Sequence, residues 1–382
     1  MNILARLQTL NVDSSVLVPK KQQTTKKIEY VRDYAELWAT ISAERKGEKN
    51  QIETINFVDC MCNAGVYSDG DCGTAIEVML IFQELAGKYP DKLFRVFCND
   101  IDGKKIAVLK TLVKDLRRPF IKNLRVYCSQ KDVNSYLDEL LHNITVDGKT
   151  LFGYGSSTLL FVDPYDFGTV EIPKLSEILK CHYCELIFNF FISDFVRNIQ
   201  QDKGRIRHCL GGIDISTKEE LIKHIRLELK TGYIKHLFSY QFRTTNNVEL
   251  YQIVFATPNV RGLEKLKEVL WKTFDGTQFH RNKAEESDQF SLFTDEDDKN
   301  TRIQSYSSEA IDMIIQYYLN RTITYNDIEI FLIENTMLNA AQIVNNVIKP
   351  MIAAGQIEKC GLVRKNNYKG DSYRIIGKRS WA

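Results

Sequence analysis

Aspartates that follow apolar segments are the first feature of this sequence that could do chemistry. Four such segments are each followed by one aspartate, and these are Asp59, Asp100, Asp132 and Asp163. Runs of β-branched and aromatic residues of this length predict buried strands. Ligands of open α/β sheets bind at the carboxyl ends of the strands. The four aspartates therefore predict a ligand site along one edge of a parallel sheet.

The first of these segments leads into a turn of small residues. Residues 55–65 read INFVDCMCNAG, and a helical pattern begins at Thr74. A strand, a small-residue turn and a helix form the opening unit of nucleotide-binding α/β domains, where the turn lets a ligand approach the backbone. Only one glycine, Gly65, stands where a strict fingerprint has three. A structural turn without a ligand is therefore the alternative.

Further apolar segments define the sheet to which this unit belongs. Parallel strands are predicted at residues 55–59, 93–99, 124–128, 158–162 and 185–191. Helical segments between them indicate a doubly wound arrangement. A strand pair predicted at residues 234–243 and 249–257 follows, which is typical of a class I methyltransferase sheet and not of a dehydrogenase sheet. The predicted fold class is therefore α/β, with a Rossmann-like methyltransferase sheet.

Length and composition limit the class of protein. The chain has 382 residues, of which 44% are hydrophobic and 26% charged, as expected for one large folded domain and a smaller one. A net charge of +2 means that any basic surface must be local. Nine cysteines lack zinc-site spacing, and neither a signal peptide nor a membrane-spanning run is evident. We expect reduced thiols, no metal site, no membrane contact and a cytoplasmic location.

Changes in composition along the chain predict four parts. They are an irregular N-terminal arm (1–27), a methyltransferase-like Rossmann domain (28–275), an acidic linker (276–306) and a winged-helix domain (307–382). The last is predicted from three helical patterns and a β-hairpin. Its basic wing, with Lys365, Lys369 and Arg374, suits contact with nucleic acid. A role in protein docking or in packing within the chain is the alternative, because the third helix has no arginine to read guanine edges.

The order of several segments resembles one protein family. FVDCMCNAG, FCNDID, LLFVDPYDFG, LIFNFFISDFVRNI and VFATPNVRGLEKLKEVLWK together resemble the three-Cys-motif partner (TcmP) family, over about residues 26–275. That family is similar to class I S-adenosylmethionine-dependent methyltransferases, and its name refers to a neighbouring gene product with three cysteines. The resemblance implies S-adenosyl-L-methionine as cofactor and that product as a possible partner. Where the family usually has the first glycine of D-L-F-A-G-x-G, this chain has Asn63, which tolerates a positive φ.

Such a cofactor assigns a role to each residue at the predicted edge. The turn from Asn63 to Gly65, with Asp59 beneath it, would hold the amino-acid end of the cofactor. Asp100 would accept hydrogen bonds from the ribose hydroxyls, and Asp132 from the adenine amino group. In a mostly apolar cleft, each of these polar groups fixes the orientation of the ligand.

The fourth strand leads into the predicted acceptor site. Asp163-Pro164-Tyr165 stands where amino-methyltransferases of nucleic acids have D-P-P-Y, whose acid and proline carbonyl accept hydrogen bonds from an exocyclic amine. Tyr165, or Phe167 in its place, would stack on the base. A tight turn after a buried strand is the alternative for this motif.

A later segment adds two candidate substrate contacts. Asn189 and Arg197 match a family segment near the same cleft, although a buried salt bridge is an equally ordinary role for Arg197. The leading hypothesis is a methyltransferase that acts on an exocyclic base amine of DNA or RNA. The contrary hypothesis is a methyltransferase-like binding partner without turnover, whose winged helix recruits DNA or a protein.

Overall fold

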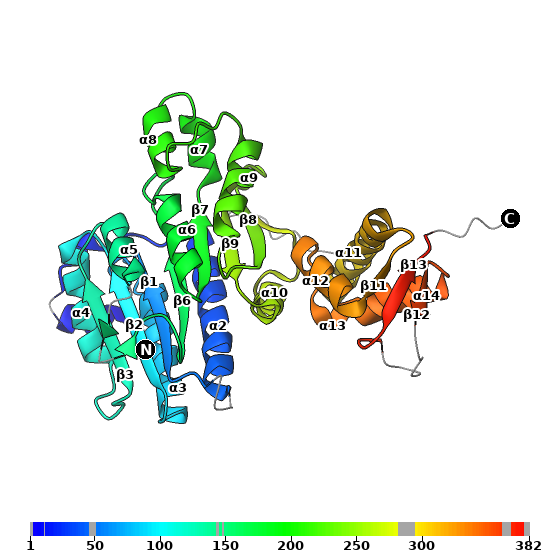
Figure 1. The fold of residues 1–382 in the computed structure, drawn as a ribbon. Helices are drawn as coiled ribbons and strands as arrows, with labels where there is room; N and C mark the ends of the chain where they lie inside the picture. Colours follow the sequence, from blue (N-terminus) through cyan, green and yellow to red (C-terminus); the bar gives the residue numbers. More distant parts are fainter. Residues whose placement is uncertain are drawn as a thin grey trace. The chain divides into compact units, whose positions relative to one another are not determined.

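A computed structural model gives the fold of residues 3–10, 12–45, 51–142, 145–146, 149–281, 295–360 and 368–377. The chain divides into two compact units. The first comprises Met1–Gly262 with Phe279–Asn282, and the second comprises Leu263–Gln278 with Lys283–Ala382. Figure 1 labels most of the elements of the two units, which are described separately here.

The first unit is built on a mainly parallel eight-stranded sheet with the strand order β10-β8-β9-β7-β6-β1-β2-β3. β9 alone runs antiparallel, to β7 on one side and to β8 on the other. The strands are β1 (Thr54–Asp59), β2 (Leu93–Asn99), β3 (Leu124–Ser129), β6 (Ser156–Val162), β7 (Glu185–Phe190), β8 (His236–Arg243), β9 (Glu249–Thr257) and β10 (Phe279–Arg281). This confirms the predicted α/β fold with a Rossmann-like methyltransferase sheet.

Strand register brings the predicted aspartates to one edge. β1 pairs in parallel with β2 and β6, so that Asp59 lies beside Cys98 on one side and Phe161 on the other. Asp100 and Asp163 follow just beyond these two neighbours. The strand order also reverses direction between β1 and β6, the kind of switch point at which α/β sheets bind ligands.

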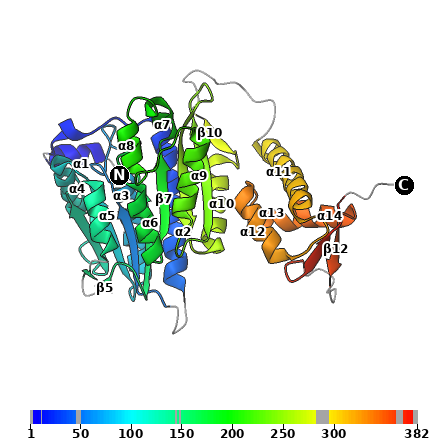
Figure 2. The same ribbon diagram turned by 45° about the horizontal axis from the view of Figure 1, so that its top comes forward.

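Helices cover the sheet and are held by local caps. They are α2 (Gln22–Glu44), α3 (Thr74–Lys88), α4 (Gly103–Leu116), α5 (Val133–Leu141), α6 (Ile172–Cys181), α7 (Ile192–Asn198), α8 (Lys203–Cys209) and α9 (Lys218–Leu229). α2 packs on α3, whereas α5, α6 and α9 share one core cluster (Figures 1 and 2). Asp102 caps α4 and Asp132 caps α5, and Thr217 forms a capping box with Glu220 at α9.

Two predictions about the chain's connecting segments are wrong. The N-terminal arm is not irregular, since it contains α1 (Ile3–Thr9), a 3₁₀ turn (Ser14–Val16) and the start of α2 at Gln22. Ile3 and Leu7 are buried and lie on one face of α1, a short apolar pattern that supports a helix. The acidic segment is not wholly a linker, because α11 (Asp295–Tyr318) begins within it. Acidic residues favour a helix when they stand in its first turn.

The second unit combines helices with a small antiparallel sheet. Its strands, in the order β11-β13-β12, are β11 (Thr322–Thr324), β13 (Ser372–Ile375) and β12 (Ile357–Cys360). Its helical segments are α11, α12 (Tyr325–Asn335), α13 (Ala340–Ile343), a π-helical turn (Val344–Ile348) and α14 (Lys349–Ala353). Lys369 and Arg374 are exposed, and Lys365 lies outside the described residues.

The boundary between the units falls inside α10 (Val260–Phe274), whose residues from Leu263 onward belong to the second unit. The buried Lys267 ammonium donates a hydrogen bond to the carbonyl of Thr336, and Trp271 Nε1 donates to the carbonyl of Met337 at 2.7 Å. Burial lowers the pKa of Lys267 well below its ordinary value. α10 is therefore part of the core of the second unit.

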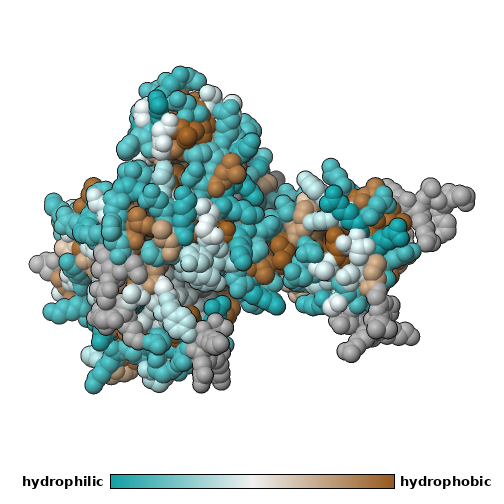
Figure 3. All heavy atoms as spheres, in the orientation of Figure 1, coloured by the Kyte–Doolittle hydropathy of each residue, from teal (hydrophilic) through white to brown (hydrophobic). Residues whose placement is uncertain are grey.

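The surface shown in Figure 3 is mostly hydrophilic, with apolar residues in small separate groups. None of the helices in the described ranges combines the length and the apolar composition that crossing a membrane requires.

Candidate functional site

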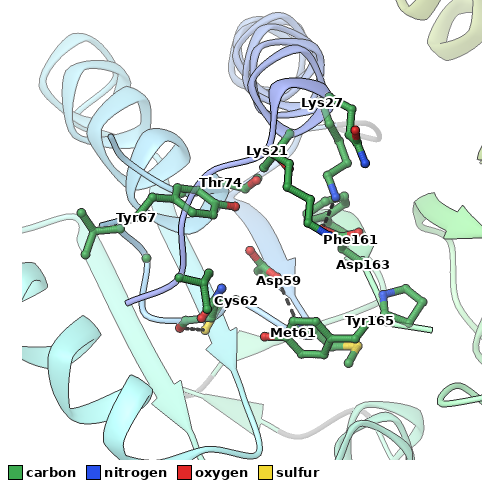
Figure 4. Close-up of a pocket in the computed structure, with 18 of the residues that line it drawn as sticks. Lys21, Lys27, Asp59, Met61, Cys62, Tyr67, Thr74, Phe161, Asp163 and Tyr165 are labelled. Atoms are coloured by element: carbon green, nitrogen blue, oxygen red, sulfur yellow. Dashed lines mark hydrogen bonds and ion pairs between the residues drawn. The ribbon is translucent and has the colours of Figure 1, made fainter. Parts of the chain in front are cut away.

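A cavity of about 340 Å³ lies at the carboxyl ends of β1 and β6. Its walls come from the end of the N-terminal arm with the start of α2 (18–27), from the turn after β1 (59–67) and from the end of β6 (161–165). Gly73 and Thr74 at the start of α3, together with Phe191 and Tyr251, complete the lining. In Figure 4, Lys21 and Lys27 reach into the cavity from the α2 side, with Asp59 between them and Met61.

The turn after β1 has the backbone that its residues require. Asn63 has a φ of 56° and Gly65 a φ of 73°, which confirms that Asn63 accommodates a positive φ. A Cβ atom on Gly65 would lie 2.5 Å from Leu109 Cδ1 and 2.9 Å from Ile76 Cγ1. The glycine is therefore required for packing against α3 and α4 as well as for its backbone angles.

Asp100 supports this turn from the end of β2. Its Oδ2 accepts a hydrogen bond from the backbone N–H of Asn63 at 3.0 Å, and its Oδ1 accepts one from the N–H of Asp102 at 2.9 Å. The carboxylate is buried and lines a second cavity of about 150 Å³, which Met61 and Tyr165 share with the first. A carboxylate offers about four acceptor sites, so Asp100 retains capacity for a ligand.

Asp132 lines the same second cavity but has a structural role as well. Its Oδ1 accepts hydrogen bonds from the N–H groups of Asn134 at 3.1 Å and Ser135 at 3.0 Å, at the start of α5. The hydrogen bond from the Ser135 side chain is the main cause that lowers the pKa of Asp132. Sequence reasoning placed Asp132 at the correct edge without identifying it as a helix cap.

Asp59 is the most perturbed acid at the edge. Its side chain is 2% exposed, and burial is the main cause that raises its pKa to about 8, with Asp163 and Asp100 adding repulsion. The N–H of Met61 donates a hydrogen bond to Asp59 Oδ1 at 3.2 Å. A positively charged group that entered the cavity would favour the ionised form of this carboxyl.

Asp163 is held by side chains from two distant segments. Lys27 Nζ lies 2.6 Å from its Oδ2, and Asn189 Nδ2 donates a hydrogen bond to its Oδ1 at 2.6 Å. The structure thus brings together Asp163 and Asn189, two of the predicted residues. Lys27 was not foreseen, because a lysine in a basic stretch is ordinarily solvent-exposed.

Aromatic side chains form much of the remaining wall. Tyr165 is half exposed, and Lys105 Nζ lies 2.9 Å from its hydroxyl. Tyr251 is 2% exposed and stacks on Phe242, with ring centroids 4.6 Å apart. Sequence reasoning missed Tyr251. The available signal was the antiparallel direction of β9, which brings the beginning of that strand to the edge where parallel strands end.

Two buried polar atoms at this end of the sheet lack partners. Within the described part of the chain, neither the Tyr251 hydroxyl nor Asn189 Oδ1 has a hydrogen-bond partner. Leaving a buried polar group without a partner costs about 1–3 kcal/mol. Atoms of this kind are candidates for contact with a ligand.

Two residues predicted to contact the substrate, Phe167 and Arg197, line neither of the two cavities. Phe167 is buried, and its ring meets Phe190 and Phe195 edge-on at centroid distances of 5.4 and 5.1 Å. Its packing in the core corrects the prediction that it stacks on a base. Arg197 is exposed on α7 and pairs with Asp194, so this ion pair lies at the surface and is not the buried salt bridge given as the alternative.

The cysteines do not assemble a metal site within the described ranges, where no group of three or more potential ligands is placed to hold an ion. Cys60, Cys62 and Cys184 are buried free thiols, whereas Cys181 is exposed. Burial raises the pKa of Cys60 well above its ordinary value, which makes this thiol unreactive.

Comparisons with known proteins concern the fold alone. No protein-family model and no curated protein sequence matches the chain. Among solved structures, it is similar to the methyltransferase domain of bacterial CtHen1 (11% identity, TM-score 0.32, 61% of this chain and 99% of that one). It is also similar to a 16S rRNA (adenine(1408)-N(1))-methyltransferase from Catenulisporales acidiphilia (11%, TM-score 0.28, 58% and 90%).

A third structure is geranyl diphosphate C-methyltransferase from Streptomyces coelicolor, in complex with S-adenosyl-L-homocysteine (8%, TM-score 0.29, 59% of this chain and 75% of that one). Because these identities and TM-scores are low, the fold assignment depends on the strand order and register described above.

Proposed function

We propose that this protein is an S-adenosylmethionine-dependent methyltransferase. The observation that carries the proposal is the placement of Asp59, Asp100 and Asp132 along two adjoining cavities at one edge of the sheet. The larger cavity suits the amino-acid end of the cofactor and the acceptor, and the smaller one suits the adenosine. The cofactor supplies an electrophilic methyl group on a sulfonium.

In this proposal, the residues of the chain bind the cofactor and orient it. Asp59 faces the ammonium group, and Asp100 accepts hydrogen bonds from the ribose hydroxyls with the acceptor sites that the backbone leaves free. Ile101 is 65% exposed beside the smaller cavity, where it can pack on a flat ring. The backbone of Asn63 to Gly65 supports the amino-acid end.

The acceptor that we favour is an exocyclic amine of a nucleic-acid base. Asp163 and the carbonyl of Pro164 accept hydrogen bonds from that amine, and the half-exposed ring of Tyr165 stacks on the base. Asp163 Oδ2 is paired with Lys27. Either Lys27 moves away from this oxygen when the amine binds, or Lys27 stays and holds the carboxylate in place while the amine donates to the other lone pair of the same oxygen. The transfer depends mainly on the alignment of amine and methyl group.

The second unit suggests how such a substrate could be recruited. Its order of elements, α11-β11-α12-α13-β12-β13, is that expected of a winged helix, and Lys369 and Arg374 present positive charge near the β12–β13 connection. We propose that this surface contacts DNA or RNA phosphates. The three-Cys protein of the TcmP resemblance is proposed as a further partner.

A second candidate function is favoured by the ion pair at Asp163. An acid whose two oxygens are taken by Lys27 and Asn189 suits a methyltransferase-like binding protein without turnover. Cofactor binding and methyl transfer, measured separately, distinguish the two candidates.

Titration calorimetry with S-adenosylhomocysteine tests the main proposal. We expect saturable binding by the unmutated protein, together with tritium transfer from labelled cofactor to total DNA or total RNA. Binding without transfer to either, or to protein, favours the second candidate. Absence of binding contradicts the methyltransferase proposal.

A further inference from the structure

The end of the N-terminal arm forms one wall of the larger cavity. Val18, Lys21 and Lys27 all line it. The backbone N–H of Ser68 donates a hydrogen bond to the carbonyl of Val18 at 3.0 Å, and Lys20 forms an ion pair with Asp71. The arm is thus fastened to the loop that follows the Asn63–Gly65 turn, so its side chains have defined positions over the cavity.

Lysines 20, 21, 26 and 27 are close in sequence, yet they differ in their partners. Lys20 pairs with Asp71, Lys26 with Glu29 at 2.7 Å, and Lys27 with Asp163 at 2.6 Å. Lys21 lines the cavity and has no ion-pair or hydrogen-bond partner for its ammonium among the residues that the structure describes. In Figure 4 it reaches toward the cavity beside Lys27. It is the lysine of this group that can meet an incoming anion without breaking an existing ion pair.

The start of α2 adds to the positive potential there. Lys21 is the N-cap residue of this 23-residue helix, no side chain caps it, and its first turn contains no acid. The N-terminal end of a helix favours negative charge. Tyr251 lines the same cavity, and its buried hydroxyl has no hydrogen-bond partner among the described residues, which independently indicates that a ligand with polar groups belongs there.

We propose that Lys21 binds the carboxylate of the cofactor's amino-acid end, so that the N-terminal arm is part of the cofactor site. The inference rests on the proposed function and deepens it. The cavity then offers the two charges that a zwitterion needs, since Asp59 faces the ammonium and Lys21 the carboxylate. The other candidate cation, Lys27, is engaged by Asp163.

Calorimetry with two ligands tests this assignment. S-adenosylhomocysteine carries the amino-acid end, whereas 5′-methylthioadenosine has the adenosine and lacks the carboxylate. We expect Lys21→Met to weaken S-adenosylhomocysteine binding about fivefold or more, because a charge-assisted hydrogen bond is lost, although exposure of Lys21 to water reduces the effect. We expect the affinity for 5′-methylthioadenosine to stay the same, and Lys21→Arg to restore the affinity for S-adenosylhomocysteine.

Lys26→Met is the matched control, since Lys26 lies further along the same helix but pairs with Glu29 and does not line the cavity. Its affinity for both ligands should equal that of the unmutated protein. Unchanged S-adenosylhomocysteine binding in Lys21→Met, or an equal loss for both ligands, overturns the role of Lys21 and leaves the proposed function intact. If the unmutated protein binds neither ligand, the proposed function fails together with this inference.

Discussion

Asp100 and Asp163 lie at the same edge of one sheet, yet they are held in different ways. Both oxygens of Asp100 accept hydrogen bonds from backbone N–H groups close to it in space, those of Asn63 and Asp102. Both oxygens of Asp163 are engaged by side chains, from Lys27 in α2 and Asn189 in β7. The first acid is fixed by the course of the main chain. The second is fixed by two side chains, whose contacts a single substitution can remove.

Under the proposed function, this difference separates a cofactor-binding half of the edge from an acceptor half. A backbone-held carboxylate keeps its place when nearby side chains vary, which suits contact with an unvarying cofactor. A carboxylate held by side chains can be tuned or released, which suits a substrate that must enter and leave. Mutations should therefore affect the two halves differently.

The largest effect should come from Asp163→Ala. We expect methyl transfer to fall about a hundredfold or more, because the acceptor amine loses its orienting group, while S-adenosylhomocysteine affinity changes little. A tritiated-methyl assay and calorimetry measure the two quantities. Asp166→Ala is the control, since Asp166 lies in the same loop but pairs with Arg205 on the surface. Equal losses of binding and of transfer would remove the distinction between the halves.

Asp100→Ala should show the opposite pattern. We expect S-adenosylhomocysteine affinity to fall about tenfold or more, because a charged hydrogen bond contributes about 1.5–3 kcal/mol. The turn at Asn63 also loses its acceptor, so the melting temperature should fall. Asp100→Asn keeps one side-chain oxygen. Its affinity for S-adenosylhomocysteine and its melting temperature should therefore lie between those of the unmutated protein and those of Asp100→Ala. Unchanged affinity in a folded Asp100→Ala protein contradicts the assignment.

Asp59 differs from both Asp100 and Asp163, because burial is the main influence on its pKa. Its pKa of about 8 in the folded protein exceeds the value of about 3.9 for an unfolded aspartate, so the neutral carboxyl stabilises the fold at low pH. That stabilisation is lost as the pH rises through 8. Between about pH 6 and pH 9, the ligand-free protein should lose about 1–3 kcal/mol of stability relative to Asp59→Asn. Denaturant unfolding of both proteins at several pH values checks this, and parallel pH profiles contradict it.

The smallest expected effect concerns Tyr251. Tyr251→Phe keeps the stacking on Phe242 and removes a buried hydroxyl without a partner. The ligand-free protein should therefore gain up to about 1–2 kcal/mol in its free energy of unfolding. Tyr240→Phe, at another buried tyrosine of the same sheet, is the comparison variant. A loss of stability in Tyr251→Phe shows that the hydroxyl has a structural role.

Local sequence patterns predicted the cofactor-binding half well. The bounds of β2 match the structure, and the positive φ of Asn63 is confirmed. These features depend on residues close in the chain, where strand propensity and turn chemistry act directly.

The acceptor half depends on distant contacts, and the sequence predicted less of it. Asp163 was placed at the edge, but its pairing with Lys27 joins residues far apart in the chain. Phe167 was assigned to the site because it follows the motif, whereas its ring packs between two core phenylalanines. An aromatic residue after a strand suits a core or a cavity equally, and only the direction of its side chain decides.

The division of the chain inside α10 has a consequence for how the protein can be taken apart. The helix begins in the first unit, while Lys267 and Trp271 donate hydrogen bonds to carbonyls of the second. A chain shortened at Phe274 would keep these donors and lose their acceptors, and a C-terminal fragment starting at residue 307 would lack a helix of its own core. The two units are therefore not modules separated by a linker, since the boundary between them falls inside one continuous helix.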